Sequence, residues 1–478
     1  MEVPGSYGVP WLSAIKDKLD FHYIQGEVEF FKSRVKKYKS TVLKVNFIPT
    51  PPGFPNPAGI ALLDQRSFPV LFDNSKVDKR DVFVGSYKPS DAFTGGVRTL
   101  AYLDTEEEKH ARLKEFVFQI LKSTGPRFLS EFEAEMASAL AGVEAEMESG
   151  TKNSIAVSSK LLDLAFNFMV KAVTGGADPS SQFGSYGPLL MQLWIGVQFA
   201  PISPRTQLPA VIEELLLRSF PLPPLIVRWP YDRIAGFFRD NATALIDMGE
   251  KQFGLDREEA LHNLVFVVGV NGFLGFSRML PSLLFYVASQ SEAFQQRLGG
   301  EIRGAMGDDG SARKFMAAVE RMPLLKSTVL EVMRIAPPVL YQYGRARREF
   351  VVESGDGREF LIRKGELLGG SQALVCRDPT VFDSPDEFVP DRFLGAQGRE
   401  LERCVFWSNG RNTDSTSSAN KQCGGKDFVE TIGRLFVAQL YLRYESIKLG
   451  PDSKPESPVI KSLRKISVAT RTGNKVSA

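Results

Sequence analysis

The 478-residue sequence predicts a mainly α-helical protein with a small β lobe. Hydrophobic residues recur at helical spacing from roughly 105 to 335, which predicts a helical body. Short strand-like segments bounded by turn residues occupy roughly 30–90 and predict an N-terminal β-rich lobe. No Pro/Ser-rich linker, charge block or internal repeat divides the chain, so we expect a single domain over 1–478.

The strands are predicted from alternation and from the turn residues beside them. Residues 41–47 alternate in side-chain type, and residues 59–63 follow a cluster of prolines and glycine. Residues 350–352 and 360–362 flank a Gly-Asp-Gly turn at 355–357, a pattern that predicts a β-hairpin.

Two helices are important for the site. Residues 256–280 predict a long apolar helix, opened by Asp256 with Glu259 three residues later, as in a capping box. A last helix is expected near 426–445, and a strand-like tail follows it.

The composition argues against several classes of function. The net charge is +3 with 24% charged residues, so nothing indicates a nucleic-acid partner. Cys376, Cys404 and Cys423 have no paired spacing, which indicates a reducing compartment without disulfides. The three histidines lie far apart, which argues against a His-rich zinc or di-iron site.

Residues 1–10 contain no basic segment that leads into an apolar core, so we expect no secretory signal. No run of about 18 apolar residues follows, and no Ser-rich, acid-poor leader is visible. We therefore expect a cytoplasmic protein that is soluble or peripherally bound, with plastid association as the alternative. The apolar stretch 220–227 is the segment expected to make any contact with a bilayer.

The residues most indicative of chemistry are Phe-Trp-Ser-Asn-Gly at 406–410 and Gln-Cys-Gly-Gly-Lys-Asp-Phe at 422–428. An aromatic turn, then a Cys with glycines and a helix start after it, is typical of a haem-thiolate site. Glycine lets the backbone approach a porphyrin, and the helix N-terminus stabilises an anionic sulfur. We therefore expect haem b as cofactor, with Cys423 as the iron ligand whose thiolate favours O–O cleavage.

The spacing of this motif resembles that of one small family. In ordinary cytochrome P-450 enzymes the corresponding Gly and Cys lie four residues apart, whereas nine additional residues intervene between Gly410 and Cys423. The insertion resembles that of the plant hydroperoxide-metabolising enzymes: allene oxide synthase, hydroperoxide lyase, divinyl ether synthase and epoxyalcohol synthase. The resemblance spans nearly the whole chain and implies a cytochrome P-450-type fold, with haem between the long distal helix and a Cys-ligand loop at 406–428.

Glu331 and Arg334 form a second motif. They lie three residues apart on a predicted helix, so their side chains can pair. Such pairs are common on surface helices, but here Glu331 and Arg334 are followed along the chain by Arg392 and then by Cys423. The arrangement resembles the Glu-x-x-Arg and Arg triad that braces the haem-binding core of the superfamily, and it implies a structural role.

The centre of the distal helix, residues 268–276, contains no acid followed by Thr. Oxygen-activating members of the superfamily carry that pair to deliver protons to dioxygen. A hydroperoxide brings its own reduced O–O bond and needs no redox partner. The resemblance therefore implies a fatty acid hydroperoxide as substrate, derived from linoleic or linolenic acid.

Asn271 and Phe83 are the candidate catalytic residues. A lone helical Asn is more often satisfied by backbone or water, but allene oxide synthases have Asn, one residue, then Phe, as at Asn271 and Phe273. The resemblance implies that Asn271 orients the hydroperoxide oxygen, although Leu274 replaces a Gly of the family. Synthases resemble this chain at Phe83, where lyases commonly have Leu. Ala101, where synthases often have Ser, favours the lyases.

Haem propionates need cations. His110 and Lys114 lie on one face of a predicted helix and match the propionate-side helix of the family, and Lys79 lies in another matching segment. The alternative for each is a solvated surface charge.

The leading hypothesis is an allene oxide synthase, a hydroperoxide dehydratase of oxylipin biosynthesis. Hydroperoxide lyase, divinyl ether synthase and epoxyalcohol synthase are the alternatives within the family. A reductase-dependent monooxygenase is disfavoured because the acid–Thr pair is missing. A non-catalytic haem carrier would not need Asn271 and Phe83 together.

Overall fold

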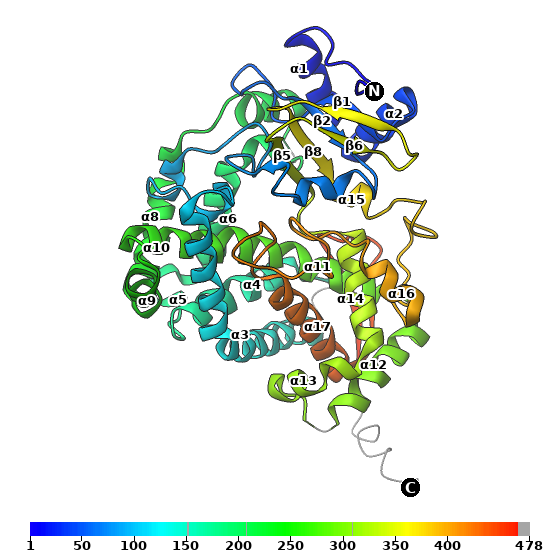
Figure 1. The fold of residues 1–478 in the computed structure, drawn as a ribbon. Coiled ribbons are helices and arrows are strands. Elements are labelled where there is room, and N and C mark those ends of the chain that lie inside the picture. Colours follow the sequence, from blue (N-terminus) through cyan, green and yellow to red (C-terminus); the bar gives the residue numbers. More distant parts are fainter. Residues whose placement is uncertain (151–152, 207, 308, 467–478) are drawn as a thin grey trace.

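The computed structural model describes residues 1–150, 153–206, 208–307 and 309–466. Figure 1 shows a β lobe, drawn at the top, above a larger helical body. The predicted fold class, mainly α with a small β lobe, is confirmed.

The main sheet of the lobe joins strands that are far apart in the sequence. Its order is β1-β2-β8-β5-β3, in which β2 and β8 are parallel and the other neighbours are antiparallel. The strands are β1 (Val42–Asn46), β2 (Ala58–Leu62), β3 (Val77–Asp78), β5 (Tyr341–Ala346) and β8 (Leu367–Ser371). The sheet therefore brings residues of β5 beside the N-terminal segments, where they line the cavity described below.

The hairpin predicted around 355–357 is confirmed: β6 (Phe350–Glu353) pairs with β7 (Glu359–Ile362). The range 30–90 begins with a helix rather than a strand. That helix, α2 (Glu27–Tyr38), follows α1 (Leu12–Leu19) and buries Phe30 and Phe31 against each other at a ring distance of 5.1 Å.

The helical body runs from α3 to α14 as predicted, and α17 completes it after the Cys-ligand loop. The helices are α3 (Glu108–Glu148), α4 (Ser158–Val173), α5 (Ser180–Phe183), α6 (Gly187–Gln198), α7 (Ala210–Glu213), α8 (Arg228–Asn241), α9 (Thr243–Phe253), α10 (Arg257–Phe266), α11 (Leu274–Ala288), α12 (Glu292–Met306), α13 (Ala312–Ala318), α14 (Pro323–Ile335), α15 (Gln372–Val375), α16 (Gly395–Glu402) and α17 (Lys426–Arg443). A small sheet of order β4-β10-β9 contains β4 (Ile155–Ala156), β9 (Tyr444–Leu449) and β10 (Val459–Lys465).

The distal helix is not regular along its length. Asp256 caps α10, accepting hydrogen bonds from the backbone of Glu258 and Glu259, and π-helical turns at Val267–Phe273 then connect α10 to α11. Gly269 lies so close to Trp194 that a Cβ would come within 2.6 Å of its ring. Such π-helical turns occur frequently at functional sites.

Among the described helices, Arg257–Ala288 has the length and hydropathy to cross a membrane. Yet 67% of its apolar window is buried inside the protein, as in the core helix of a soluble protein.

A buried charge cluster joins α14 to the segment that leads to the Cys-ligand loop. Glu331 accepts hydrogen bonds from Arg334 at 2.7 and 2.8 Å and from Arg392 at 2.9 Å. Arg334 also donates to the carbonyl oxygens of Cys376 and Pro385. Because Glu331 and Arg334 are fully buried and these contacts satisfy them, removing one partner leaves an uncompensated buried charge.

We expect Arg334→Met to destabilise the protein by about 3–5 kcal/mol, because Glu331 loses its main partner in the interior. The measurement is urea-induced unfolding. Arg403→Met is the control, since the Arg403–Glu400 pair is exposed and worth at most about 1 kcal/mol. Equal unfolding midpoints for the two variants would show that the cluster does not brace the fold.

Candidate active site

A cavity of about 610 Å³ is lined by residues of both the β lobe and the helical body. Its lining includes Cys423, Trp407 and Asn409 of the Cys-ligand loop, Asn271, Phe273 and Leu274 of the distal helix, and Phe83, Lys79, Ala101 and Tyr343. The predicted iron ligand Cys423 and the predicted catalytic residues Asn271 and Phe83 therefore face the same cavity.

The Cys-ligand loop is closed by a tight turn. Trp407 donates its backbone N–H to the Gly410 carbonyl at 2.8 Å, and Ser408 and Asn409 between them have positive φ of 40° and 64°. A Cβ at Gly410 would lie 2.5 Å from the Gln422 side chain and would displace its carboxamide from the hydrogen bond that it donates to the Arg411 carbonyl. The nine additional residues thus begin and end at this contact between Gly410 and Gln422, which places Cys423 beside the turn.

Cys423 precedes α17 by three residues. Burial raises the pKa of its thiol, while a hydrogen bond from the Gly425 backbone and the Lys114 ammonium act in the opposite direction. Both opposing contacts favour the thiolate, which is the form that binds iron. A thiolate at this place needs a cation in addition to the Lys114 ammonium, because burial by itself would keep the sulfur protonated.

The additional residues are held by Asn420. Its side-chain oxygen accepts hydrogen bonds from Lys114 at 3.0 Å and from the backbone of Gln422 at 3.2 Å, and its amide nitrogen donates to the Ser415 carbonyl. The structure thus places Lys114 on this loop and near Cys423, and its contact with a haem propionate stays a prediction.

Asn271 lies in the π-helical turns and is open to the cavity. Its carboxamide has no hydrogen-bond partner among the described residues, so it is free to bind a ligand. Cavity-lining residues of the distal helix (Val270, Asn271, Phe273, Leu274, Gly275, Ser277 and Arg278) include no carboxylate. The wall facing Cys423 can therefore orient a polar oxygen but has no acid to deliver protons.

Phe83 belongs to an aromatic wall of the same cavity. Its ring meets Tyr102 edge-on at 5.7 Å and lies 6.3 Å from Phe199. This packing holds the ring in place and gives the cavity an apolar side.

Two lysines place positive charge beside the cavity. Lys79 is buried and donates to the Tyr343 carbonyl at 2.6 Å, and Lys421 donates to the carbonyls of Leu100 and Leu103. Burial, with repulsion between the two ammonium groups, lowers the pKa of Lys79 to about 7. Burial, with repulsion from Lys114, lowers that of Lys421 to about 7.

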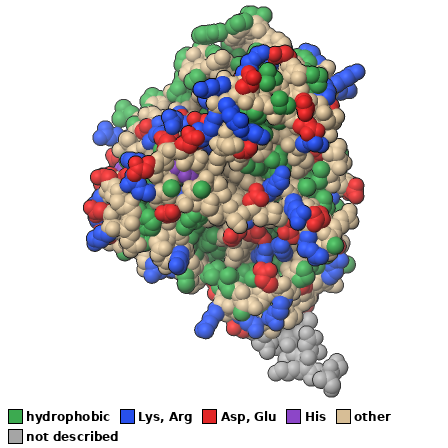
Figure 2. Space-filling view, in the orientation of Figure 1, with side chains coloured by type: hydrophobic (Ala, Val, Ile, Leu, Met, Phe, Trp, Pro, Cys, Tyr) green, Lys and Arg blue, Asp and Glu red, His purple; other side chains and the backbone are tan. Residues whose placement is uncertain are grey.

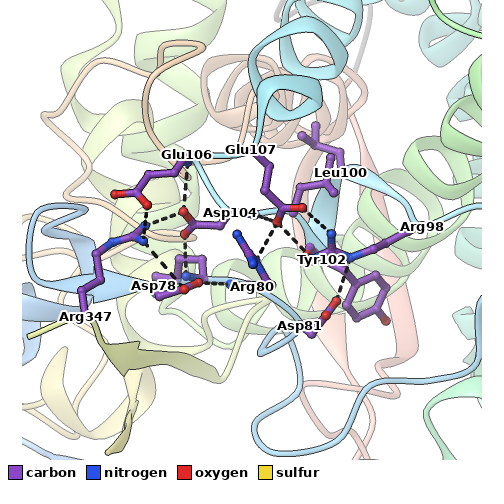
Figure 3. A network of polar contacts seen from close by, with 12 residues as sticks. Asp78, Arg80, Asp81, Arg98, Leu100, Tyr102, Asp104, Glu106, Glu107 and Arg347 are labelled. Atoms are coloured by element: carbon purple, nitrogen blue, oxygen red, sulfur yellow. Dashed lines mark hydrogen bonds and ion pairs between the residues drawn. The ribbon is translucent and has the colours of Figure 1, made fainter. Parts of the chain in front are cut away.

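Nearby acids are already engaged elsewhere, as Figure 3 shows. Asp104 is bonded to Arg347, and Glu107 is bonded to Arg98. Neither Lys79 nor Lys421 forms an ion pair within 4.0 Å among the described residues. No described carboxylate pairs directly with either side chain, so both are available to an anion bound in the cavity.

The residues present fit haem. Trp407 lines the cavity, and its Nε1 is buried without a hydrogen-bond partner in the described part of the chain, as expected of a group that meets a bound ligand. The Nδ1 of His110 is also without a partner among the described residues, but His110 is not among the residues that line the cavity. Burial lowers the pKa of His110 to about 3, so its ring is neutral and acts as a hydrogen-bonding group. Cys423 would bind the iron, and Lys79 and Lys421 would face the propionates. Sequence reasoning missed Lys421, although it lies only two residues before Cys423.

The fold and this thiol-bearing cavity define a haem-thiolate protein of the cytochrome P450 class, and the sequence profile "Cytochrome P450" matches residues 239–470. The chain is 45% identical over 480 residues to the divinyl ether synthase CYP74M3 of Selaginella moellendorffii, which covers 98% of this chain and 96% of the relative. It therefore belongs to the CYP74 family of haem-thiolate enzymes.

The names of other relatives state two different activities. The divinyl ether synthase CYP74M1 of the same organism is 47% identical over 453 residues, covering 95% of this chain and 94% of the relative. The chloroplastic allene oxide synthase of Linum usitatissimum is 42% identical over 466 residues, covering 97% and 86%. Haem with a cysteine thiolate ligand is thus the cofactor, and family enzymes act on fatty acid hydroperoxides without a redox partner.

We expect Cys423→Ser to abolish the Soret absorption of a haem thiolate and all hydroperoxide consumption, because a hydroxyl at this position does not form a thiolate. The absorption spectrum and haem content report the ligand, and peroxide loss reports activity. Cys404→Ser, which removes a thiol outside the cavity lining, is the control. Full activity in the Cys423 variant would exclude Cys423 as the ligand.

Proposed function

We propose that the protein is a fatty acid hydroperoxide dehydratase, and specifically an allene oxide synthase. The observation that carries this proposal is the unpartnered carboxamide of Asn271, which shares a cavity with Cys423 on a distal helix without an acid–Thr pair. Such a cavity suits a substrate that supplies its own O–O bond.

Cys423 would hold the haem iron, and haem bound through this thiolate would supply the cleavage of the O–O bond. Asn271 donates a carboxamide N–H to the hydroperoxide oxygen and so orients the bond for cleavage. Phe83, held edge-on by Tyr102, keeps the reacting carbon chain in an apolar, water-poor environment and favours its oxidation over chain cleavage.

Divinyl ether synthase is the second candidate. Two such enzymes are 45% and 47% identical to this chain, against 42% for the Linum allene oxide synthase. Leu274, which lines the cavity one turn beyond Asn271, is a bulky group where allene oxide synthases have glycine. Both products are the hydroperoxide minus one water, so either activity is a dehydratase, whereas lyase and epoxyalcohol products are isomers of the substrate.

Arg278 provides a second recognition element. It lies seven residues after Asn271, about 10 Å further along the helix. It lines the cavity and donates to the Pro338 carbonyl at 3.4 Å, with no ion pair within 4.0 Å among the described residues. The Glu27 carboxylate, which lines the same cavity, already acts on the Arg278 charge. We assign to Arg278 the carboxylate of the fatty acid, which would add a direct ion pair to this interaction.

We also propose a cellular compartment for the protein. Allene oxide synthases of Linum usitatissimum and Arabidopsis thaliana are named chloroplastic, which supports plastid association beside the predicted cytoplasmic location.

The test of function is incubation of the purified haem protein with 9- and 13-hydroperoxides of linoleic and linolenic acid, without NADPH or reductase. We expect the hydroperoxide to disappear and products one water lighter to form, an α-ketol after water trapping identifying the allene oxide. Asn271→Ala should slow turnover at least about 100-fold, because the orienting hydrogen bond is lost. A strict requirement for an electron donor would contradict the proposal, and short-chain aldehydes would indicate a lyase.

We expect Arg278→Gln to raise the KM for the free acid by about 10- to 100-fold, since a hydrogen bond to a charged group contributes about 1.5–3 kcal/mol. The KM for the methyl ester should change less than about twofold. Arg205→Gln is the matched variant, because Arg205 lines the exposed end of the same cavity. Acid–ester discrimination that depends on Arg205 instead would reassign the carboxylate site.

A further inference from the structure

A second cavity of about 480 Å³ lies in the N-terminal part of the protein. Residues 6–8, α1, α2 and β1 contribute its lining, and Figure 1 shows these elements together at the top of the molecule. We call this cavity the N-terminal pocket. It shares no lining residue with the cavity that contains Cys423, so a ligand bound here would not compete with haem or substrate.

The carboxylates that line the N-terminal pocket are already compensated. Asp17 accepts hydrogen bonds from Arg34 at 2.6 Å and from the side-chain amide of Asn46 at 2.8 Å. Asp20 accepts from Lys16 at 2.9 Å. These two acids and two bases form a neutral network, which leaves no carboxylate of the lining available to a further cation.

Two other lysines give the pocket an excess of positive charge. Lys37 of α2 and Lys44 of β1 line it, and neither ammonium forms a hydrogen bond or an ion pair within 4.0 Å among the described residues. Lys37 lies 5.0 Å from the ring of Tyr38, and Lys44 lies 6.0 Å from that of Tyr7. The lining thus holds four cations and two carboxylates, an excess of two positive charges. Figure 2 shows Lys and Arg side chains beside Asp and Glu at the surface of this upper part of the molecule.

Hydroxyl groups in the same lining supply hydrogen-bond donors. Burial, with the nearby Glu366 carboxylate, raises the pKa of Tyr7 to about 12, so its phenol keeps the proton at neutral pH. Glu366 itself forms no ion pair with Lys44 within 4.0 Å. Ser6 and Ser13 each accept a hydrogen bond from a backbone N–H and donate to no described group. An oxygen-rich anion can accept hydrogen bonds from ammonium and hydroxyl groups together.

Charge, size and polarity together indicate the class of ligand. Two uncompensated ammonium groups match a phosphate monoester, which carries about −1.5 to −2 charges at pH 7 and three acceptor oxygens. The volume of about 480 Å³ lies in the range of small-molecule sites and is far larger than a phosphate ion needs. Val45 is the one aliphatic side chain of the lining, so the remainder of the ligand is expected to be polar.

We propose that the N-terminal pocket binds a phosphorylated, water-soluble small molecule whose phosphate group is recognised by Lys37 and Lys44. The hydroxyl groups of Tyr7, Ser6 and Ser13 donate further hydrogen bonds to the ligand. This binding site is separate from the hydroperoxide chemistry and does not depend on the proposed function.

The test is isothermal titration calorimetry of the full-length haem protein with inorganic pyrophosphate at constant ionic strength. We expect a dissociation constant below about 1 mM. Lys37→Gln/Lys44→Gln should weaken binding at least about tenfold, because the charge-assisted hydrogen bonds to the phosphate are lost. The matched control is Lys32→Gln/Lys36→Gln, which removes two lysines of α2 that do not line the pocket and should bind as the parent does.

Tyr7→Phe, which keeps the ring and removes the hydroxyl donor, serves as a second variant and should weaken binding about 2- to 10-fold. Haem content and circular dichroism report folding of each variant. Absence of pyrophosphate binding by the parent up to about 10 mM, or equal weakening in both double variants, would overturn the proposal. Binding of phosphatidic acid vesicles without binding of pyrophosphate would also overturn it, because the pocket would then recognise a lipid headgroup. None of these measurements uses a hydroperoxide, so their outcome is independent of turnover.

Discussion

Lys79 and Lys421 lie beside the cavity with carbonyl oxygens as their hydrogen-bond partners. This positive charge constrains which ligand the cavity can hold. An ammonium group removed from water is costly unless an anion lies nearby, and the depressed pKa values of both lysines express that cost. The propionates of haem, dianionic in sum, would compensate it. We therefore propose that the protein holds its cofactor by charge as well as through the sulfur of Cys423.

The opposite wall of the cavity explains why the substrate has to bring its own oxidant. Asn271 offers one uncommitted carboxamide in a wall that is otherwise apolar apart from Ser277 and Arg278. Orientation of an existing O–O bond requires a hydrogen-bond donor, whereas reduction of dioxygen requires protons delivered in sequence. The π-helical turns around Asn271 and the close contact of Gly269 with Trp194 keep this wall in place.

Features encoded by neighbouring residues could be predicted from the sequence. The 355–357 hairpin, the cap at Asp256 and the pairing of Glu331 with Arg334 depend on spacings of a few residues. The prediction of Cys423 as the iron ligand rests on the same kind of signal, because a Cys between an aromatic turn and a helix start is a local pattern. Family membership, too, is carried by the sequence along nearly its full length.

Tertiary structure alone decided which charges have partners. Lys114 matches a propionate ligand in sequence but is bonded to Asn420, while Lys421 and Arg278 had no local signal and became visible only because they line the cavity. The burial of Glu213 and Arg218 beside the exposed Val211 and Leu215 is likewise invisible in composition, since it depends on which side of the segment meets Tyr23 and Ser203. Local spacing determines secondary structure and indicates which cysteine is the predicted thiolate ligand. Burial and compensation of charge depend on segments that only folding brings together.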